Sequence, residues 1–187
     1  MSAVIYPLWL LSILYYLVWI GTIYLASRGF GLSATMVHLL YGILLVITSH
    51  PPQRHHLWRR GLLACFIGYT FDSSLVIFNL ISFPTQSLMG EISPFWMTSL
   101  WFTFAILLNR ELKWLLQRRT LAISLGLIGG PLSYLGGAQS GAMSVSHPPE
   151  LAALVIGSGW GVLMGLASYF WSGEDRPRQT EVNRELK

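Results

Sequence analysis

Apolar residues follow one another along this chain in long runs, and polar residues gather between those runs. Six runs are long enough to cross a bilayer, at roughly residues 7–27, 32–49, 61–83, 94–109, 120–138 and 150–172. A membrane-spanning helix needs about 20 mainly apolar residues to cross a hydrocarbon core of about 30 Å. We therefore predict an all-α fold: a polytopic membrane protein built as a bundle of six transmembrane helices.

Positive charge is distributed unevenly between the predicted loops. Of the 12 Lys and Arg residues, all but Arg28 fall on the side of the N-terminus: Arg54, Arg59 and Arg60; Arg110, Lys113, Arg118 and Arg119; and Arg176, Arg178, Arg184 and Lys187. Short loops rich in Lys and Arg remain in the cytoplasm. The pattern thus predicts an N-in/C-in topology, with both termini cytoplasmic.

The composition is typical of a membrane protein and leaves no soluble domain. It is 53% hydrophobic and 11% charged, whereas soluble domains carry about 25% charged residues. We predict a single transmembrane domain over 1–173 and a short polar cytoplasmic tail over 174–187. The net charge of +4 then points to anionic lipid head groups and not to nucleic acid. The expected contacts are Arg54, Arg59, Arg60, Arg110, Lys113, Arg118 and Arg119; the sequence names no protein partner.

The fifth run has two features that bear on helix packing. Gly129, Gly130 and Pro131 lie near its middle, so this helix should kink or break there. Small residues also recur every fourth position, at Ala122, Gly126 and Gly130 in the fifth run and at Ala153, Gly157, Gly161 and Gly165 in the sixth. Such spacing lets helix backbones approach closely, which predicts a tightly packed pair.

Asp72 is the leading candidate for chemistry, because it lies near the centre of the third run. Ionisable residues at that depth are costly and usually face the bundle interior or a wet cavity. Asp72 would serve as a proton carrier, a general acid or base, or a ligand for an ion or head group. The structural alternative is a buried carboxyl group that is hydrogen-bonded to a neighbouring helix.

Three further polar residues are candidates beside Asp72. His38, in the second run, could pair with Asp72 as a relay or general base, or could simply bond a backbone carbonyl near the outer interface. Tyr134 follows the Gly-Gly-Pro sequence, where a bent helix beside an intramembrane acid favours a binding site. Asn109 ends the fourth run near Glu111, and a solvated interfacial cluster is the plainer interpretation there.

Several known chemistries are not supported by the sequence. The Gly157-Ser158-Gly159 segment lacks a histidine in a later span that could activate the serine. His55 and His56 have no cysteine or carboxylate nearby in the sequence, which argues against a metal site. There is no phosphate-binding loop and no dinucleotide fingerprint. We therefore expect no cofactor and no metal.

Three stretches together resemble a known family. They are residues 94–105 (PFWMTSLWFTFA) with the LLN and LKWL sequences that follow, residues 129–137 (GGPLSYLGG), and Asp72. Over roughly residues 30–172 the chain is similar to the bacterial membrane proteins called domain of unknown function 2878. The resemblance implies a small multi-pass protein of the bacterial inner membrane, associated with genes for fatty-acid and membrane-lipid modification. Asp72, Asn109, Pro131 and Tyr134 match the family pattern, whereas Glu111 departs from it.

Two classes of function follow as expectations. In the first, the protein handles or acts on membrane lipids or fatty-acyl groups through an intramembrane polar site formed by Asp72, His38, Tyr134 and Asn109. In the second, it is a non-enzymatic membrane partner or small carrier in which Asp72 is structural or relays protons. The sequence does not decide whether the protein is an enzyme.

Overall fold

The computed structural model describes residues 8–83, 92–146 and 148–171, and these ranges are almost wholly helical. The elements are α1 (Leu8–Ser27), α2 (Gly31–Ile47), α3 (Pro51–Ile77), β1 (Ile81–Ser82), α4 (Phe95–Asn109), α5 (Lys113–Leu116), α6 (Arg119–Gln139), β2 (Ser144–Val145) and α7 (Pro149–Trp171). The all-α prediction is confirmed for these ranges. The predicted polar tail and its four basic residues lie outside them.

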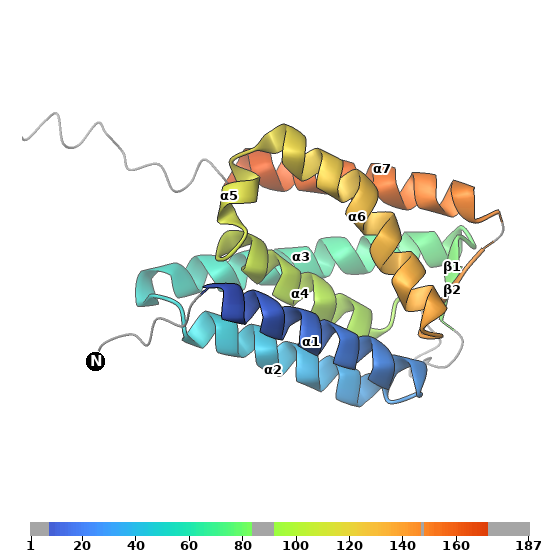
Figure 1. The fold of residues 1–187 in the computed structure, drawn as a ribbon, viewed down its shortest axis with the longest axis horizontal. Coiled ribbons are helices and arrows are strands. Elements are labelled where there is room, and N and C mark those ends of the chain that lie inside the picture. The colour runs from blue at the N-terminus through green and yellow to red at the C-terminus, as the bar shows by residue number, and fades with distance from the viewer. Residues whose placement is uncertain (1–7, 84–91, 147, 172–187) are drawn as a thin grey trace, which may run out of the picture.

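The six long helices run alternately up and down, so that their ends gather at two opposite faces of the bundle (Figure 1). The start of α3, the short helix α5 and the end of α7 lie at one end; the turn between α1 and α2 and the two strands lie at the other. All the described basic residues except Arg28 therefore belong to the first end, which we call the basic end. The strands pair antiparallel, with Ile81 opposite Val145.

Three of the helices are long and apolar enough to cross a membrane: α3, α6 and α7. The other apolar helices are shorter, at Ile13–Ser27, Gly31–Ile47 and Phe95–Asn109. With 15 residues, α4 rises only about 22 Å, which is less than the hydrocarbon core of about 30 Å. Six crossings and the orientation of the termini stay predictions.

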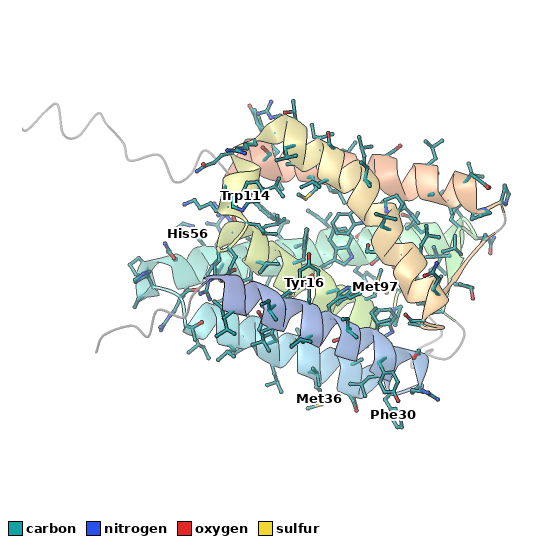
Figure 2. All side chains as sticks on the ribbon, viewed as in Figure 1. Tyr16, Phe30, Met36, His56, Met97 and Trp114 are labelled. Atoms are coloured by element: carbon teal, nitrogen blue, oxygen red, sulfur yellow. The ribbon has the colours of Figure 1, made fainter. Side chains whose placement is uncertain are left out.

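Large apolar side chains cover the outside of the bundle. Figure 2 shows Phe30 and Met36 pointing away from α1 and α2, and their exposed fractions are 59% and 55%. Soluble monomers rarely expose wide contiguous apolar patches. The apolar helices and their apolar surface together indicate a helical membrane protein.

The helix α3 begins earlier than the sequence led us to expect. The predicted span covers 61–83, but α3 starts at Pro51 and ends at Ile77. Proline is favoured in the first turn of a helix because its missing N–H is not needed there, so Pro51 and Pro52 start α3. Arg54, Arg59 and Arg60 consequently lie on this helix and not in the predicted loop.

Phe102 fills the contact between α2, α3 and α4. It is 2% exposed and lies against two glycines, Gly42 on α2 and Gly61 on α3. A Cβ atom would come within 2.8 Å of the Phe102 ring at Gly42 and within 2.7 Å at Gly61. Only glycine at both positions admits the ring without a shift.

The helices α6 and α7 form the close pair that their small residues predict. A Cβ atom at Gly126 would lie 2.6 Å from the carbonyl oxygen of Trp160, and one at Gly157 would lie 2.7 Å from the carbonyl oxygen of Leu127. Both distances are shorter than real Cβ contacts allow. The two backbones therefore touch directly, with small residues at the crossing.

Pro131 bends α6 without breaking it. The helix is continuous over Arg119–Gln139 with Pro131 inside it, and Figure 1 shows its axis changing direction along its length. Proline cannot donate to the carbonyl four residues earlier, which is that of Leu127. This carbonyl instead faces Gly157 of α7, where a Cα–H group can approach it.

Candidate functional site

Asp72 joins three helices through its carboxylate. It lies on α3 with 0% of its surface exposed. Trp101 on α4 donates from Nε1 to Asp72 Oδ2 at 2.8 Å, and the Tyr134 hydroxyl on α6 donates to Asp72 Oδ1. Each carboxylate oxygen thus has its own donor, which offsets part of the cost of burying the group.

Glycines make room for the indole that binds Asp72. One helical turn before Asp72, Gly68 faces Trp101, and a Cβ atom there would lie 2.1 Å from the indole Cγ. Trp101 stacks on Trp160 of α7, with ring centroids 4.4 Å apart and planes at 17°. A Cβ atom at Gly130 would in turn lie 2.5 Å from Trp160 Cγ. The two stacked indoles are therefore held between glycines of α3 and α6.

A cavity of about 580 Å³ lies beside this network. Its walls come from α1, α4, α6 and α7 with α5, and the lining includes Trp96, Trp101, Tyr134, Trp160 and Met164. Asp72 is not among the lining residues. Trp101 and Tyr134 consequently form a wall that separates the carboxylate from the cavity.

The cavity is elongated along the helices and opens sideways. Its lining on α6 runs from Leu125 to Gly137, a distance of about 18 Å at the helical rise of 1.5 Å per residue. Tyr16 on α1 and Leu132 on α6 also line it and are 65% and 61% exposed. Figure 2 shows Tyr16 standing on the side of α1 that faces α6. The mouth therefore lies between α1 and α6.

His38 does not pair with Asp72. Its Nδ1 atom lies 3.0 Å from the hydroxyl of Thr22 on α1, and Thr103 on α4 donates to its backbone carbonyl at 3.2 Å. The ring is 0% exposed and is not part of the cavity lining. The relay pair is therefore not found, and the recorded partner of the His38 side chain is a hydroxyl and not a backbone carbonyl. His38 is a buried contact between α1, α2 and α4.

Asn109 belongs to a second polar cluster at the basic end. Its side-chain oxygen accepts from Arg60 Nη1, and its amide donates to the Ala105 carbonyl at 2.7 Å. The Arg60 guanidinium also lies 5.7 Å from the centre of the Trp171 ring. This cluster connects α3, α4 and α7, and it is separate from the cavity.

The interpretation of Asn109 and Glu111 as a solvated cluster is wrong for Glu111, which is buried, whereas Asn109, Arg110 and Lys113 are half-buried. Glu111 is 7% exposed and Arg60 is 8% exposed. Glu111 Oε1 lies 3.2 Å from Arg110 Nε, and Arg110 donates to the Leu45 carbonyl and, at 3.1 Å, to Thr48 Oγ1. Burial raises the pKa of the Glu111 carboxyl above its usual value, while the nearby Arg110 charge acts in the opposite direction.

The indoles of Trp101 and Trp160 are the site residues that sequence reasoning missed. Both lie in stretches of aromatic or small residues whose composition is typical of any membrane-spanning helix. One signal was available: Gly68 lies one turn before Asp72 on the same face of α3, and a small residue beside a buried acid leaves room for a large donor from a neighbouring helix.

The comparison with known families agrees with the resemblance noted in the sequence. The model of the family described as protein of unknown function DUF2878 matches residues 5–166. No curated protein and no solved structure matches the chain. The match covers most of the chain and includes the whole of the Asp72 network and every residue that lines the cavity. This protein therefore belongs to the DUF2878 family.

Proposed function

We propose that this protein binds one acyl chain of a membrane lipid in the cavity between α1, α4, α6 and α7. The length and the lining of the cavity support this proposal. Its length of about 18 Å is close to half of the hydrocarbon core of about 30 Å, which is the depth that the chains of one leaflet occupy. Its volume of about 580 Å³ lies within the range of about 300–1,000 Å³ that is usual for small-molecule sites.

The mouth supports a ligand that arrives from the bilayer. Tyr16, Leu125 and Leu132 line the cavity and are partly exposed on the flank of the bundle. In a membrane this flank faces lipid, so a chain can enter sideways without crossing water. No carboxylate, histidine, cysteine, lysine or arginine occurs among the described residues that line the cavity. This lining favours binding and handling of a lipid over chemistry on it.

Asp72 then acts as a positioning residue. It holds the Tyr134 hydroxyl and the Trp101 indole, and these two side chains form part of the cavity wall. The proposed location is the inner membrane, with both termini in the cytoplasm, as the distribution of basic residues predicts. Anionic head groups would then lie against the basic end, at Arg54, Arg59 and Arg118 among others.

A second candidate role is supported by the burial of Asp72 behind the wall. In that role the carboxylate only locks α3, α4 and α6 together, and the cavity is filled by lipid non-specifically. The two roles predict different results when the cavity is filled by a larger side chain. If Asp72 is only structural, the amount of lipid bound to the protein should not change; if the cavity binds a lipid, that lipid should be lost.

The experiment is to fill the cavity and count the bound lipid. Gly129 lines the cavity, and a Cβ atom at this position would meet nothing within 4 Å, so Gly129→Phe should place a ring in the cavity without disturbing the helices. Gly21→Phe is the matched control, because Gly21 has equally open surroundings and lies outside the lining. Lipid that copurifies in detergent is then measured by native mass spectrometry.

We expect Gly129→Phe to lose a bound lipid that the wild-type protein and Gly21→Phe both retain. Equal lipid content in the three proteins, with equal recovery of folded protein, would contradict the proposed binding function. A deletion strain whose lipid extract differs from that of the parent strain would identify the affected lipid.

A further inference from the structure

The polar atoms of the cavity are distributed unevenly along its length. Near the end opposite to the basic end, Trp96 in the first turn of α4 lines the wall. Trp101 follows about 7.5 Å further along α4, at the level where it and Tyr134 meet Asp72. At the basic end the lining consists of Leu112, Leu115 and Met164. Hydrogen-bonding groups thus occur at one end and in the middle, and only apolar side chains occur at the other end.

Trp96 is the distinctive group of the polar end. It is 1% exposed, and among the described residues its Nε1 atom has no hydrogen-bond partner. Tryptophan N–H groups normally have a partner when they are buried. Tryptophan is common at membrane interfaces, where its ring contacts head groups, but the burial of Trp96 excludes that explanation.

From this asymmetry we infer that the ligand is a lipid with an oxygen acceptor beside its chain, bound with that oxygen at Trp96 and its tail toward Leu112 and Leu115. An indole N–H only donates, so the group it binds must be an acceptor such as an ester or carboxyl oxygen. Because Trp96 lies away from the basic end, the lipid comes from the leaflet opposite the basic residues. The inference rests on the proposed function and adds the class and direction of the ligand.

Photolabelling tests the direction of the chain. Two phosphatidylcholine probes are used in phosphatidylcholine nanodiscs, one with a diazirine next to the ester and one with a diazirine next to the terminal methyl. We expect the first probe to label Trp96 and Met97 and the second to label Leu115 and Met164. These residues are buried, so bulk lipid on the outside of the bundle does not reach them.

Two other outcomes of this labelling are informative. The reverse pattern, or equal labelling of both ends by each probe, overturns the inference about direction and leaves the binding function intact. Absence of label from all the buried cavity residues with both probes overturns the binding function itself. The two failures are thereby distinguishable.

A competition experiment tests the role of the Trp96 indole. Methyl palmitate and hexadecane compete with the photolabel in wild-type protein, in Trp96→Phe and in Trp114→Phe; Trp114 is exposed on α5 and lies outside the cavity. We expect methyl palmitate to compete roughly two- to tenfold less well in Trp96→Phe, which is the usual effect of one hydrogen bond. Hexadecane should compete equally well in all three proteins. An equal loss for both competitors, or no loss for either, overturns the assignment.

Discussion

Replacing the Asp72 carboxylate by an amide of the same shape tests the network that joins α3, α4 and α6. The carboxylate accepts one hydrogen bond from Trp101 Nε1 and one from the Tyr134 hydroxyl. An asparagine has one acceptor oxygen, and its NH₂ group only donates. In Asp72→Asn the amide oxygen can accept from Trp101, but the NH₂ group faces the Tyr134 hydroxyl, which must turn from donor to acceptor. Both hydrogen bonds then lose the contribution of the carboxylate charge.

The expected cost follows from the two hydrogen bonds that are weakened. A hydrogen bond to a charged group contributes about 1.5–3 kcal/mol and a neutral one about 0.5–1.5 kcal/mol, so the free energy of unfolding should fall by about 1–3 kcal/mol. The unfolding equilibrium constant then rises roughly 5- to 150-fold. The lower cost of burying a neutral amide acts in the opposite direction. The sign of the change consequently shows whether the hydrogen bonds or the burial of charge dominates at Asp72.

Unfolding by sodium dodecyl sulfate in mixed micelles, followed by tryptophan fluorescence, measures this change. Glu150→Gln is the control, because Glu150 is exposed in the first turn of α7 and an acid there contributes at most about 1 kcal/mol. If Asp72→Asn proves as stable as the wild-type protein or more stable, the cost of burying the charge outweighs the hydrogen bonds, and the network gives the bundle no net stability.

A second variant assigns the weakened bond to its partner. In a Tyr134→Phe background Asp72 has only the hydrogen bond from Trp101, so Asp72→Asn weakens one bond there instead of two. The substitution should therefore cost less there than in the wild-type background, with a coupling of about 1–2 kcal/mol. The same cost in both backgrounds would show that the Tyr134 hydroxyl is not coupled to Asp72.

Two further predictions concern the packing of α6 on α7 and the basic end. Gly157→Ala places a methyl group 2.7 Å from the Leu127 carbonyl oxygen and should destabilise the protein by about 1–3 kcal/mol. Gly129→Ala is the control: its methyl group would lie in open space, so it should be neutral or stabilising by up to about 1 kcal/mol. Equal stabilities of the two variants in the detergent titration would refute the close contact. Burial raises the folded-state pKa of Glu111 above its usual 4.5, so the folded state binds this proton more tightly than the unfolded state. The contribution of Glu111 to the free energy of unfolding is therefore largest below about pH 4.5 and is lost as the pH rises through its folded-state pKa. In a plot of the free energy of unfolding against pH, Glu111→Gln should remove this decrease, and Glu150→Gln should leave it unchanged.

The positions of the helices could largely be predicted from the sequence, because apolar runs and helix ends are local features. The close pair of α6 and α7 was also predictable, since glycines every fourth residue mark one face of each helix. The start of α3 was predicted too late, because the charged residues Arg54, Arg59 and Arg60 were assigned to a loop. Two prolines at the first turn begin a helix regardless of the polarity of the residues that follow.

The partners of the polar residues could not be predicted in the same way. Asp72 was identified as buried from its depth alone, but His38 was a plausible partner only because α2 and α3 are neighbours in sequence. The actual donors come from α4 and α6, and which helices meet α3 depends on tertiary packing. The burial of Glu111 was missed for a related reason: Arg110 beside it extends to carbonyl and hydroxyl groups of α2, a contact that no local pattern indicates.

The location of Asp72 behind the cavity wall connects the stability of the bundle with its proposed function. Apolar side chains of suitable volume can lock helices together at least as well as a buried charge, so helix packing alone does not require a carboxylate there. A carboxylate differs from an apolar side chain because its hydrogen bonds are directional. Its two acceptor oxygens fix the rotamers of the Trp101 indole and the Tyr134 phenol. Since Trp101 and Tyr134 both line the cavity, fixing them fixes the shape of the wall against which an acyl chain would lie. Loss of Asp72 should therefore change lipid binding even in a variant whose stability has been restored by a second substitution elsewhere in the bundle.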